Sequence, residues 1–218
     1  MRIKVSDYIS KFLKEKNIKH VFAVSGGASL HLIHSVAKTN NIQYVCPTHE
    51  QACAMAADAY SRYTKNSSVV FTSSGPGATN LSTGICGAFF DSIPVIFITG
   101  QVSTFRAKRN LKVRQVGFQE TECVSMYKSV TKYICKINKP EQIVYELEKA
   151  YFIANNSRPG PVLLDIPDNI QREFINLKKS KKFIIKSNKR SISYENKKIS
   201  SKINLINNLL DKSERPVL

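Results

Sequence analysis

Glu50 is the residue whose type and position most suggest chemistry. It lies in the stretch CPTHEQACAMAADAYSRY, residues 46–63, where a strand-like run meets an alanine-rich run typical of a helix. A carboxyl group there can exchange a proton with a bound ligand, or it can stabilise the positive end of the helix dipole by ~0.3–1 kcal/mol. Thr48 and Gln51 have the spacing of a capping box, which places Glu50 in the first helical turn. Local spacing alone favours the structural interpretation.

Two glycine-rich joins also have residue types that suit a ligand. They are SGGAS, residues 25–29, and SGPGATN, residues 74–80. Neither has the spacing of a P-loop or of the G-x-G-x-x-G dinucleotide fingerprint. Each is typical of a tight turn from strand to helix, and the backbone N–H groups of such a turn can face the polar atoms of a ligand. Both interpretations stay open at this point.

The sequence indicates neither metal ligands nor paired cysteines. The five cysteines are scattered without a C-x-x-C pair, which argues against a disulfide framework or a zinc site and favours a reducing cytoplasm. His31 and His34 can share a helix face, but no carboxylate or cysteine lies near them in sequence. Nothing in the spacing identifies a nucleophile triad or a carboxylate pair. We therefore expect no metal ligand in this chain.

Alternating strand-like and helix-like segments must position these residues. Apolar runs predict six strands, within HVFAVSG, IQYVCP, SVVFTSSGPG, IPVIFITG, TKYICKI and GPVLLDIP. Several runs are continuously apolar, as in parallel strands buried on both faces. The pattern predicts a doubly wound α/β domain, with helices on both faces of a mainly parallel sheet. The joins SGGAS, PTHE, SSGPGATN and TGQ then lie at the carboxyl edge, where such sheets bind ligands.

The intervening segments predict helices. ATNLSTGICGAFF is expected to be helical, and PEQIVYELEKAYFIANN is expected to form a helix. In the helix after Glu50, Ala52, Ala56 and Ala59 recur at helical spacing. Such a row of small side chains predicts close packing against a neighbour, in this chain or in another subunit.

The net charge of +17 first suggests a nucleic-acid partner. However, eleven Lys and Arg residues and only two acids lie within residues 172–202, and the remaining excess is spread along the chain. This distribution indicates a solvated linker and no nucleic-acid surface. We expect a domain over residues 1–172, a basic linker over 173–202 and the start of a truncated central domain over 203–218. No apolar run is long enough to predict a membrane span.

Seven segments, taken in order, resemble a known family. They are VFAVSGGASLHLIH, HEQACAMAADAYSR, SSGPGATNLSTGI, DSIPVIFITGQV, GFQET, VTKY and RPGPVLLDIPDNIQ. Their order and intervals resemble the N-terminal, pyrimidine-binding domain of thiamine-diphosphate enzymes of the acetolactate synthase type. The resemblance covers about residues 1–172 and implies the six-stranded thiamine-diphosphate-binding fold.

The resemblance also implies roles for single residues. Glu50 matches the glutamate that hydrogen-bonds N1′ of the aminopyrimidine and thereby helps to remove the thiazolium C2 proton. A carboxyl group shielded from water suits such a shared proton. The other matching positions are Gly26, Gly27 and Ala28 near the reacting carbon, Phe118 and Gln119 near the substrate, and Gly75, Pro76, Gly77 and Asn80 near the cofactor. Gly27 also faces the substrate, and Gln119 is implied as a catalytic partner. The basic segment 102–116 could touch an anionic substrate or a subunit.

The family implies cofactors and partners beyond this chain. Its members hold Mg²⁺ and the diphosphate with a G-D-G motif, which this sequence lacks, and FAD contacts lie mainly in a central domain. The resemblance implies a 2-oxo acid substrate such as pyruvate and a homodimer or dimer of dimers. It also implies that these 218 residues alone are inactive. The alternatives are a decarboxylase, an acyltransferase or a C–C hydrolase with the same cofactor, or a binding domain without catalysis.

Overall fold

Six parallel strands form the central sheet. The computed structural model describes residues 2–185 and 192–216. The strands are, in chain order, β2 (His20–Ala23), β3 (Gln43–Val45), β4 (Ser68–Thr72), β5 (Val95–Gln101), β6 (Tyr133–Lys136) and β7 (Val162–Pro167). Their order in the sheet is β3-β2-β4-β5-β7-β6, and each neighbouring pair is parallel. All six predicted strands are therefore confirmed.

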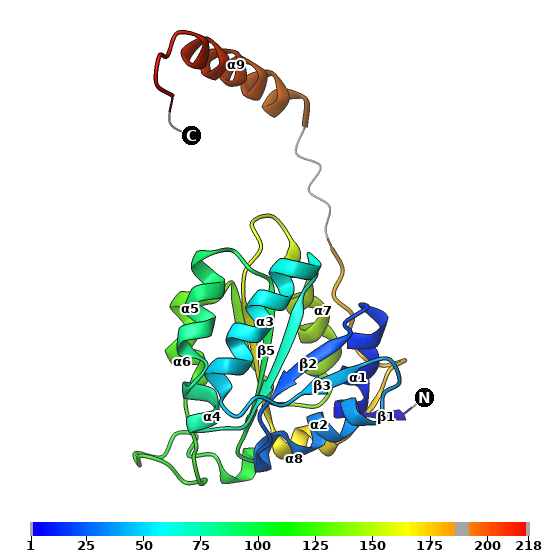
Figure 1. Ribbon diagram of the computed structural model, residues 1–218. Coiled ribbons are helices and arrows are strands. Elements are labelled where there is room, and N and C mark those ends of the chain that lie inside the picture. The colour runs from blue at the N-terminus through cyan, green and yellow to red at the C-terminus, as the bar shows by residue number, and fades with distance from the viewer. Residues whose placement is uncertain (1, 186–191, 217–218) are drawn as a thin grey trace. The chain divides into compact units, whose positions relative to one another are not determined.

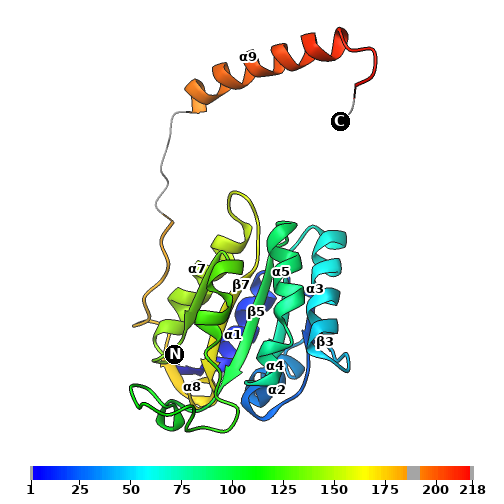
Figure 2. The same ribbon diagram turned by 90° about the vertical axis from the view of Figure 1, so that its left-hand side faces the viewer.

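Helices cover both faces of this sheet (Figures 1 and 2). One face carries α1 (Val5–Glu15), α2 (Leu30–Ala37), α7 (Gln142–Asn155) and α8 (Asp168–Arg172). The other face carries α3 (Glu50–Thr64), α4 (Pro76–Thr79), α5 (Ser82–Phe90) and α6 (Cys123–Tyr127). Short 3-10 turns lie at Gly27–Ser29, Thr104–Arg106 and Lys128–Val130. The doubly wound α/β fold is confirmed.

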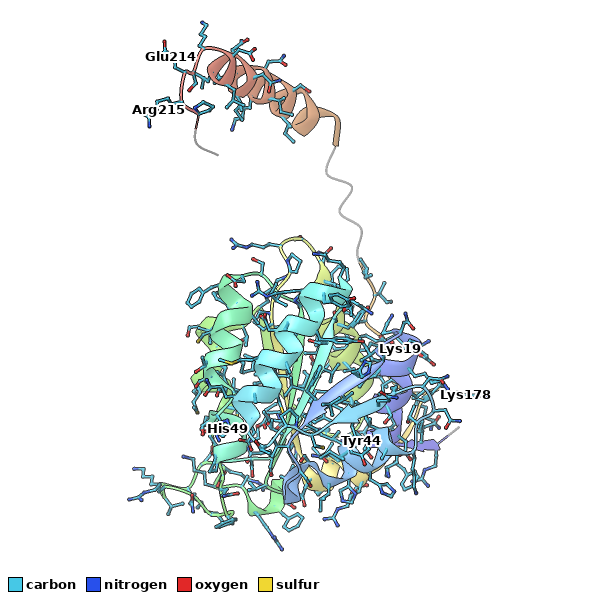
Figure 3. All side chains as sticks on the ribbon, viewed as in Figure 1. Lys19, Tyr44, His49, Lys178, Glu214 and Arg215 are labelled. Atoms are coloured by element: carbon cyan, nitrogen blue, oxygen red, sulfur yellow. The ribbon has the colours of Figure 1, made fainter. Side chains whose placement is uncertain are left out.

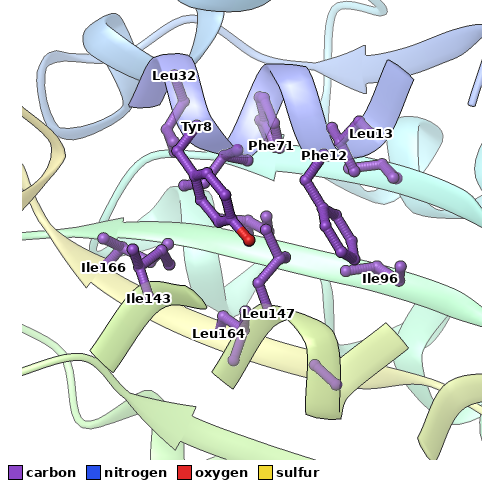
Figure 4. Packing of buried hydrophobic residues seen from close by; sticks show 14 of the residues in the cluster. Tyr8, Phe12, Leu13, Leu32, Phe71, Ile96, Ile143, Leu147, Leu164 and Ile166 are labelled. Carbon is purple, nitrogen blue, oxygen red and sulfur yellow. The ribbon is translucent and has the colours of Figure 1, made fainter. Parts of the chain in front are cut away.

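The hydrophobic core lies in two layers, one on each side of the sheet. In β5, which is buried along its whole length, Ile96 belongs to the cluster beneath α1 and α7, while Phe97 belongs to the cluster beneath α3 and α5. Figure 4 shows the first cluster, in which Phe12 of α1 and Leu147 of α7 lie over the strands. Successive strand residues point to opposite faces, so burial on both faces explains the continuous apolar runs.

A second, small sheet ties the start of the chain to the segment after α8. It consists of β1 (Arg2–Lys4) and β8 (Phe174–Asn176), which pair antiparallel. The N–H of Val5 also donates to the carbonyl oxygen of Glu173 at 2.9 Å. The sequence did not predict this sheet, and β8 lies within the range predicted as a linker. The domain boundaries at residues 172 and 202 stay predictions.

Residues 184–218 form a separate compact unit. It contains α9 (Ile192–Asp211), and Figure 3 labels Glu214 and Arg215 just beyond that helix. The predicted start of a central domain over 203–218 ends in residues 217–218, which lie outside the described residues. Throughout the described part of the chain, no helix combines the length and the apolar character that a membrane crossing requires.

The segment ATNLSTGICGAFF, predicted to be helical, forms two consecutive helices. Asn80 and Leu81 separate α4 from α5. The hydroxyl of Tyr127 donates to the carbonyl oxygen of Ala78 at 2.7 Å and lies 3.2 Å from that of Thr79. In a continuous helix these carbonyls would accept from N–H groups four residues further on. The contact with Tyr127 stabilises the break, and the break turns Asn80 towards α3.

The alanine row of α3 packs only in part within this domain, through Ala56, which lies against the core cluster. Ala52 and Ala59 are exposed and Ala56 is partly buried, whereas Ala54 and Ala57 are buried against α5 and the sheet. The close-packed face of α3 is therefore shifted from the predicted one. Contact of the exposed row with another subunit stays a prediction.

Candidate functional site

The carboxyl edge of the sheet brings several predicted joins together. The loop after β2 contacts the loop after β4, because the N–H of Ala28 donates to Oγ of Ser73 at 3.3 Å. It also contacts β5, since a Cβ on Gly100 would come within 2.0 Å of the carbonyl oxygen of Ala28. Nε2 of Gln171, on α8 after β7, donates to the same carbonyl at 2.7 Å. Four strand ends thus build one surface.

Glu50 is the first residue of α3 at this edge. The predicted capping box is wrong, because His49 and not Thr48 is the N-cap: Nδ1 of His49 accepts from the N–H of Gln51 at 3.1 Å. The extended backbone of His49 lets its own imidazole reach that N–H, which Thr48 is one residue too early to do. Figure 3 shows His49 at the end of α3 that lies close to α4.

The carboxyl group of Glu50 is held from one side. Nδ2 of Asn80 donates to Oε2 of Glu50 at 2.9 Å. A Cβ on Gly77 would lie 3.5 Å from Oε1 of Glu50 and 3.3 Å from Cβ of Ser73. Oε1 has no hydrogen-bond partner among the described residues. Glu50 therefore presents one oxygen fixed by Asn80 and one free oxygen beside Gly77. The side chains of Glu50 and Asn80 are both partly buried.

A tight turn at Gly75 positions Gln119. Gly75 has a φ of +61°, a backbone conformation that favours glycine. A Cβ at this position would come within 2.6 Å of Cβ of Gln119. Gln119 itself has a positive φ of 58°. The loop after β4 and the segment after β5 are thus in direct contact at the two residues predicted to face the cofactor and the substrate.

A pocket of about 370 Å³ lies beside this contact. It is lined by four residues predicted for the site, Gly27, Ala28, Phe118 and Gln119. It is also lined by Val102, Ser103 and Arg106, which belong to the basic segment 102–116 predicted to touch an anionic substrate or a subunit. The remaining lining residues, Ser73, Ser74, Gln101 and Asp168, were not predicted individually as site residues. Glu50 and Asn80 do not line the pocket, and Gly77 connects them to it through Ser73. Pro76 is exposed at the start of α4.

Ser103 and Asp168 come together from distant parts of the chain. The hydroxyl of Ser103 donates to Oδ1 of Asp168, and the N–H of Asn169 donates to the same oxygen at 2.7 Å. Asp168 directly follows the last strand, so its place at the carboxyl edge was available as a sequence indication. Ser103 lies two residues after the TGQ join, in the basic segment 102–116, but its contact with Asp168 was not predicted.

Behind the pocket lies a buried acid, Asp165 on β7. Its carboxylate accepts from the hydroxyl of Thr99 at 2.8 Å and from Nε2 of Gln101 at 3.0 Å. Burial raises the pKa of Asp165 to about 6, although these hydrogen bonds act in the opposite direction. Gln101 also donates to the carbonyl of Thr121 at 2.7 Å and accepts from the N–H of Val102 at 2.9 Å. The network fixes both ends of the segment that carries Gln119.

The residues around Glu50 fit the aminopyrimidine of thiamine diphosphate. The free oxygen of Glu50 can form the one hydrogen bond that a ring nitrogen needs. Gly77 puts backbone without a side chain beside this oxygen, and a Cβ there would lie 3.5 Å from it. The missing side chain at Gly77 leaves the surface next to the carboxyl group open to a flat ring.

A parallel sheet with an acid and glycine turns at its carboxyl edge defines a class of ligand-binding α/β domain. Within that class, residues 3–126 match the family model described as thiamine pyrophosphate enzyme, N-terminal TPP binding domain. The chain belongs to this family, and its relatives place it in the acetolactate synthase-like branch.

Three relatives illustrate the match. The chain is 38% identical over 175 residues to acetolactate synthase 2, chloroplastic, of Nicotiana tabacum, covering 79% of this chain and 25% of the relative. It is 33% identical over 217 residues to the acetolactate synthase large subunit of Buchnera aphidicola, covering 98% and 36%. It is 37% identical over 177 residues to the probable acetolactate synthase large subunit of Methanocaldococcus jannaschii, covering 81% and 29%. The chain thus spans about a quarter to a third of the length of these relatives.

Proposed function

We propose that this chain is the pyrimidine-binding part of a thiamine-diphosphate-dependent carboligase that acts on 2-oxo acids such as pyruvate. The names of the relatives support acetolactate synthase-like chemistry. The observation that carries the proposal is the carboxyl group of Glu50, held by Asn80 at 2.9 Å with its second oxygen free beside Gly77.

Glu50 shares a proton with N1′ of the aminopyrimidine. Asn80 donates to Oε2, so the rotation of the carboxyl group is restricted and Oε1 is directed to the ring. The partly buried position of Glu50 limits competition from water for the same hydrogen bond. Asn80 is then a positioning residue, because it acts on the cofactor only through Glu50.

The bound cofactor supplies a nucleophilic carbon and takes up the electrons released when the 2-oxo acid loses CO₂. Gly27 and Ala28 leave room for the substrate near that carbon, and Gln119 donates a hydrogen bond to its oxygen atoms. Phe118 is 82% exposed in this chain and lines the pocket, where its ring contacts the apolar part of the substrate. Gly75, Pro76 and Gly77 form the turn next to the cofactor.

The remaining partners belong to the same proposal. Mg²⁺ binds with the diphosphate in a part of the protein that this chain does not include, FAD is a possible second cofactor, and a homodimer or dimer of dimers is the active unit. The row of exposed residues Ala52 and Ala59 on α3 supports contact with another subunit. The five cysteines are free, which is typical of a reducing compartment, and we therefore propose a cytoplasmic location.

Product analysis tests the function. The full-length gene product is incubated with pyruvate, thiamine diphosphate and Mg²⁺, and the products are separated by chromatography. We expect acetolactate. Acetaldehyde alone would assign the protein to the decarboxylases. As a control, the 218-residue chain under the same conditions is expected to form no product.

A further inference from the structure

The pocket beside Gln119 is lined by a carboxylate and a guanidinium group in addition to Gly27, Ala28, Phe118 and Gln119. Asp168, at the start of α8, and Arg106, in the segment after β5, both line it. Ser73, Ser74 and Ser103 add hydroxyl groups to the lining. A pocket for an acceptor that carries only methyl and methylene groups needs none of these, since such groups are matched by apolar side chains.

The two carboxylate oxygens of Asp168 differ in their partners, because only Oδ1 accepts hydrogen bonds. Oδ1 accepts from the hydroxyl of Ser103 and from the N–H of Asn169. Oδ2 forms an ion pair with Nη2 of Arg172 at 3.9 Å, a separation too long for a hydrogen bond. The side chain of Asp168 is 30% exposed. Asp168 lines the pocket, and its Oδ2 accepts no hydrogen bond from the described residues and has only the long ion pair with Arg172.

Two further hydrogen bonds, between Thr104 and Asn169, hold the chain next to Asp168 in place. The N–H of Thr104 donates to Oδ1 of Asn169 at 2.9 Å, and Nδ2 of Asn169 donates to the hydroxyl of Thr104 at 3.0 Å. These bonds attach the segment after β5 to the start of α8. The guanidinium of Arg106 lies over the ring of Phe105 at 5.7 Å, and no carboxylate of the described residues forms an ion pair with it.

We propose that Asp168 determines acceptor specificity, with Oδ2 accepting a hydrogen bond from a hydroxyl group of the acceptor. The preferred acceptor is then a hydroxylated aldehyde or ketone. An aliphatic acceptor offers Oδ2 no hydrogen-bond donor, so the carboxylate is desolvated with only the long ion pair to Arg172, which is unfavourable for a charged group. Arg106 attracts a carboxylate on either kind of ligand, so it adds affinity without selecting for the hydroxyl group.

The reaction rests on the proposed function and balances as follows for pyruvate and an aldehyde. A C–C bond forms between the acyl carbon of pyruvate and the carbonyl carbon of the acceptor. The bond between that acyl carbon and the pyruvate carboxylate breaks, and CO₂ leaves. The acceptor oxygen takes up one proton.

The first test compares glycolaldehyde with acetaldehyde as acceptors, using the full-length gene product with pyruvate as donor. We expect kcat/KM for glycolaldehyde to exceed that for acetaldehyde by about 10- to 100-fold. In Asp168→Leu this ratio falls to about 1, whereas Asp168→Asn, which keeps a hydrogen-bonding group, retains part of it. A folding defect lowers both rates alike and leaves the ratio unchanged.

Binding without turnover gives a second readout. By titration calorimetry, glycerate is expected to bind the full-length gene product at least about tenfold more tightly than propionate, and Asp168→Leu removes the difference. Arg106→Gln is the matched control, which weakens both ligands alike. The inference is wrong if the two aldehydes react equally, if the two acids bind equally, or if Arg106→Gln removes the preference. Absence of carboligation with both aldehydes overturns the proposed function itself.

Discussion

The contact between Gly75 and Gln119 shows how single residues shape the site. Gly75 has a φ of 61° and a ψ of −127°, a backbone conformation that residues with a Cβ rarely adopt. Its missing Cβ is also what lets Gln119 approach the turn. The same position therefore determines both the local backbone and the distance between two segments of the site.

Replacing Gly75 by alanine is expected to destabilise the domain by about 1–3 kcal/mol, because the new Cβ adds backbone strain and overlaps Gln119. Urea unfolding measures the change. Gly27→Ala is the matched control, since an added Cβ there meets nothing within 4 Å, and it should leave stability nearly unchanged. Equal stabilities of the two variants would contradict this account of the turn.

The pKa of Asp165 gives a pH-dependent prediction. Its folded-state pKa is raised from 3.8 to about 6, so the folded protein holds the proton more tightly than the unfolded chain. Asp165 therefore contributes stability that is fully present below about pH 4 and is lost as the pH rises through about 6. The shift corresponds to about 3 kcal/mol. Asp165→Asn cannot lose this proton and should flatten that part of the profile.

Urea unfolding of the wild type and Asp165→Asn between pH 4 and pH 7 measures this difference. In the variant, the amide can still accept from Gln101 and donate to the hydroxyl of Thr99, so a large loss of stability at pH 4 is not expected. Parallel pH profiles would mean that Asp165 is ionised in the folded protein across the whole range.

At the scale of elements, the close approach of α3 and α5 positions Glu50. A Cβ on Gly84 would lie 2.2 Å from Cβ of Ala54 and 3.3 Å from the backbone of that residue. The two helices therefore touch through their backbones at this point. Because α3 begins at Glu50, a shift of this contact moves the carboxyl group relative to Asn80, which lies just before α5.

Gly84→Ala is expected to cost about 1–3 kcal/mol of stability, since the backbone of Ala54 cannot yield without moving α3. Gly87→Ala lies in the same helix with nothing within 4 Å of the new Cβ, and it should be neutral or stabilising by up to about 1 kcal/mol. Thermal unfolding of both variants tests the pair. A Gly84 variant as stable as the Gly87 variant would show that the two helices are not tightly packed.

The sequence predicted the strands of this fold better than the helix ends. Buried parallel strands are continuous apolar runs, which are visible without any tertiary information. The cap by His49 and the break stabilised by Tyr127 depend on side chains whose contacts are set by the fold. The pairing of β1 with β8 joins three-residue strands from opposite ends of the domain, and such short segments carry no periodic pattern.

The candidate site was predictable where a join has an unusual composition. The glycines and Glu50 stand out at strand ends, and the structure brings Gly27, Ala28, Phe118 and Gln119 to one pocket. Ser103 and Asp168 are ordinary residue types, and their contact requires the segment after β5 to meet the start of α8. Their functional roles, and those of the predicted residues, stay predictions until variants are measured.

At the scale of the whole molecule, the chain presents one side of a proposed site. Figure 1 shows the segment after β5 extending from the sheet edge at which α4 lies. Glu50 begins α3 and is bonded to Asn80 just after α4, and the segment after β5 contributes Arg106, Phe118 and Gln119 to the pocket. The relatives are about three to four times longer than the matched region. We therefore expect the diphosphate and its metal to be bound by other parts of the protein, with Glu50 reaching the pyrimidine from this domain.

The rate of hydrogen–deuterium exchange at C2 of bound thiamine diphosphate tests the role of Glu50 most directly. It is measured by NMR on acid-quenched samples of the full-length gene product and of Glu50→Gln, both saturated with cofactor. We predict that Glu50→Gln slows the exchange by about 10²- to 10⁴-fold, because an amide cannot share the proton at N1′. Exchange at the wild-type rate in the saturated variant would contradict the central claim that Glu50 activates the cofactor.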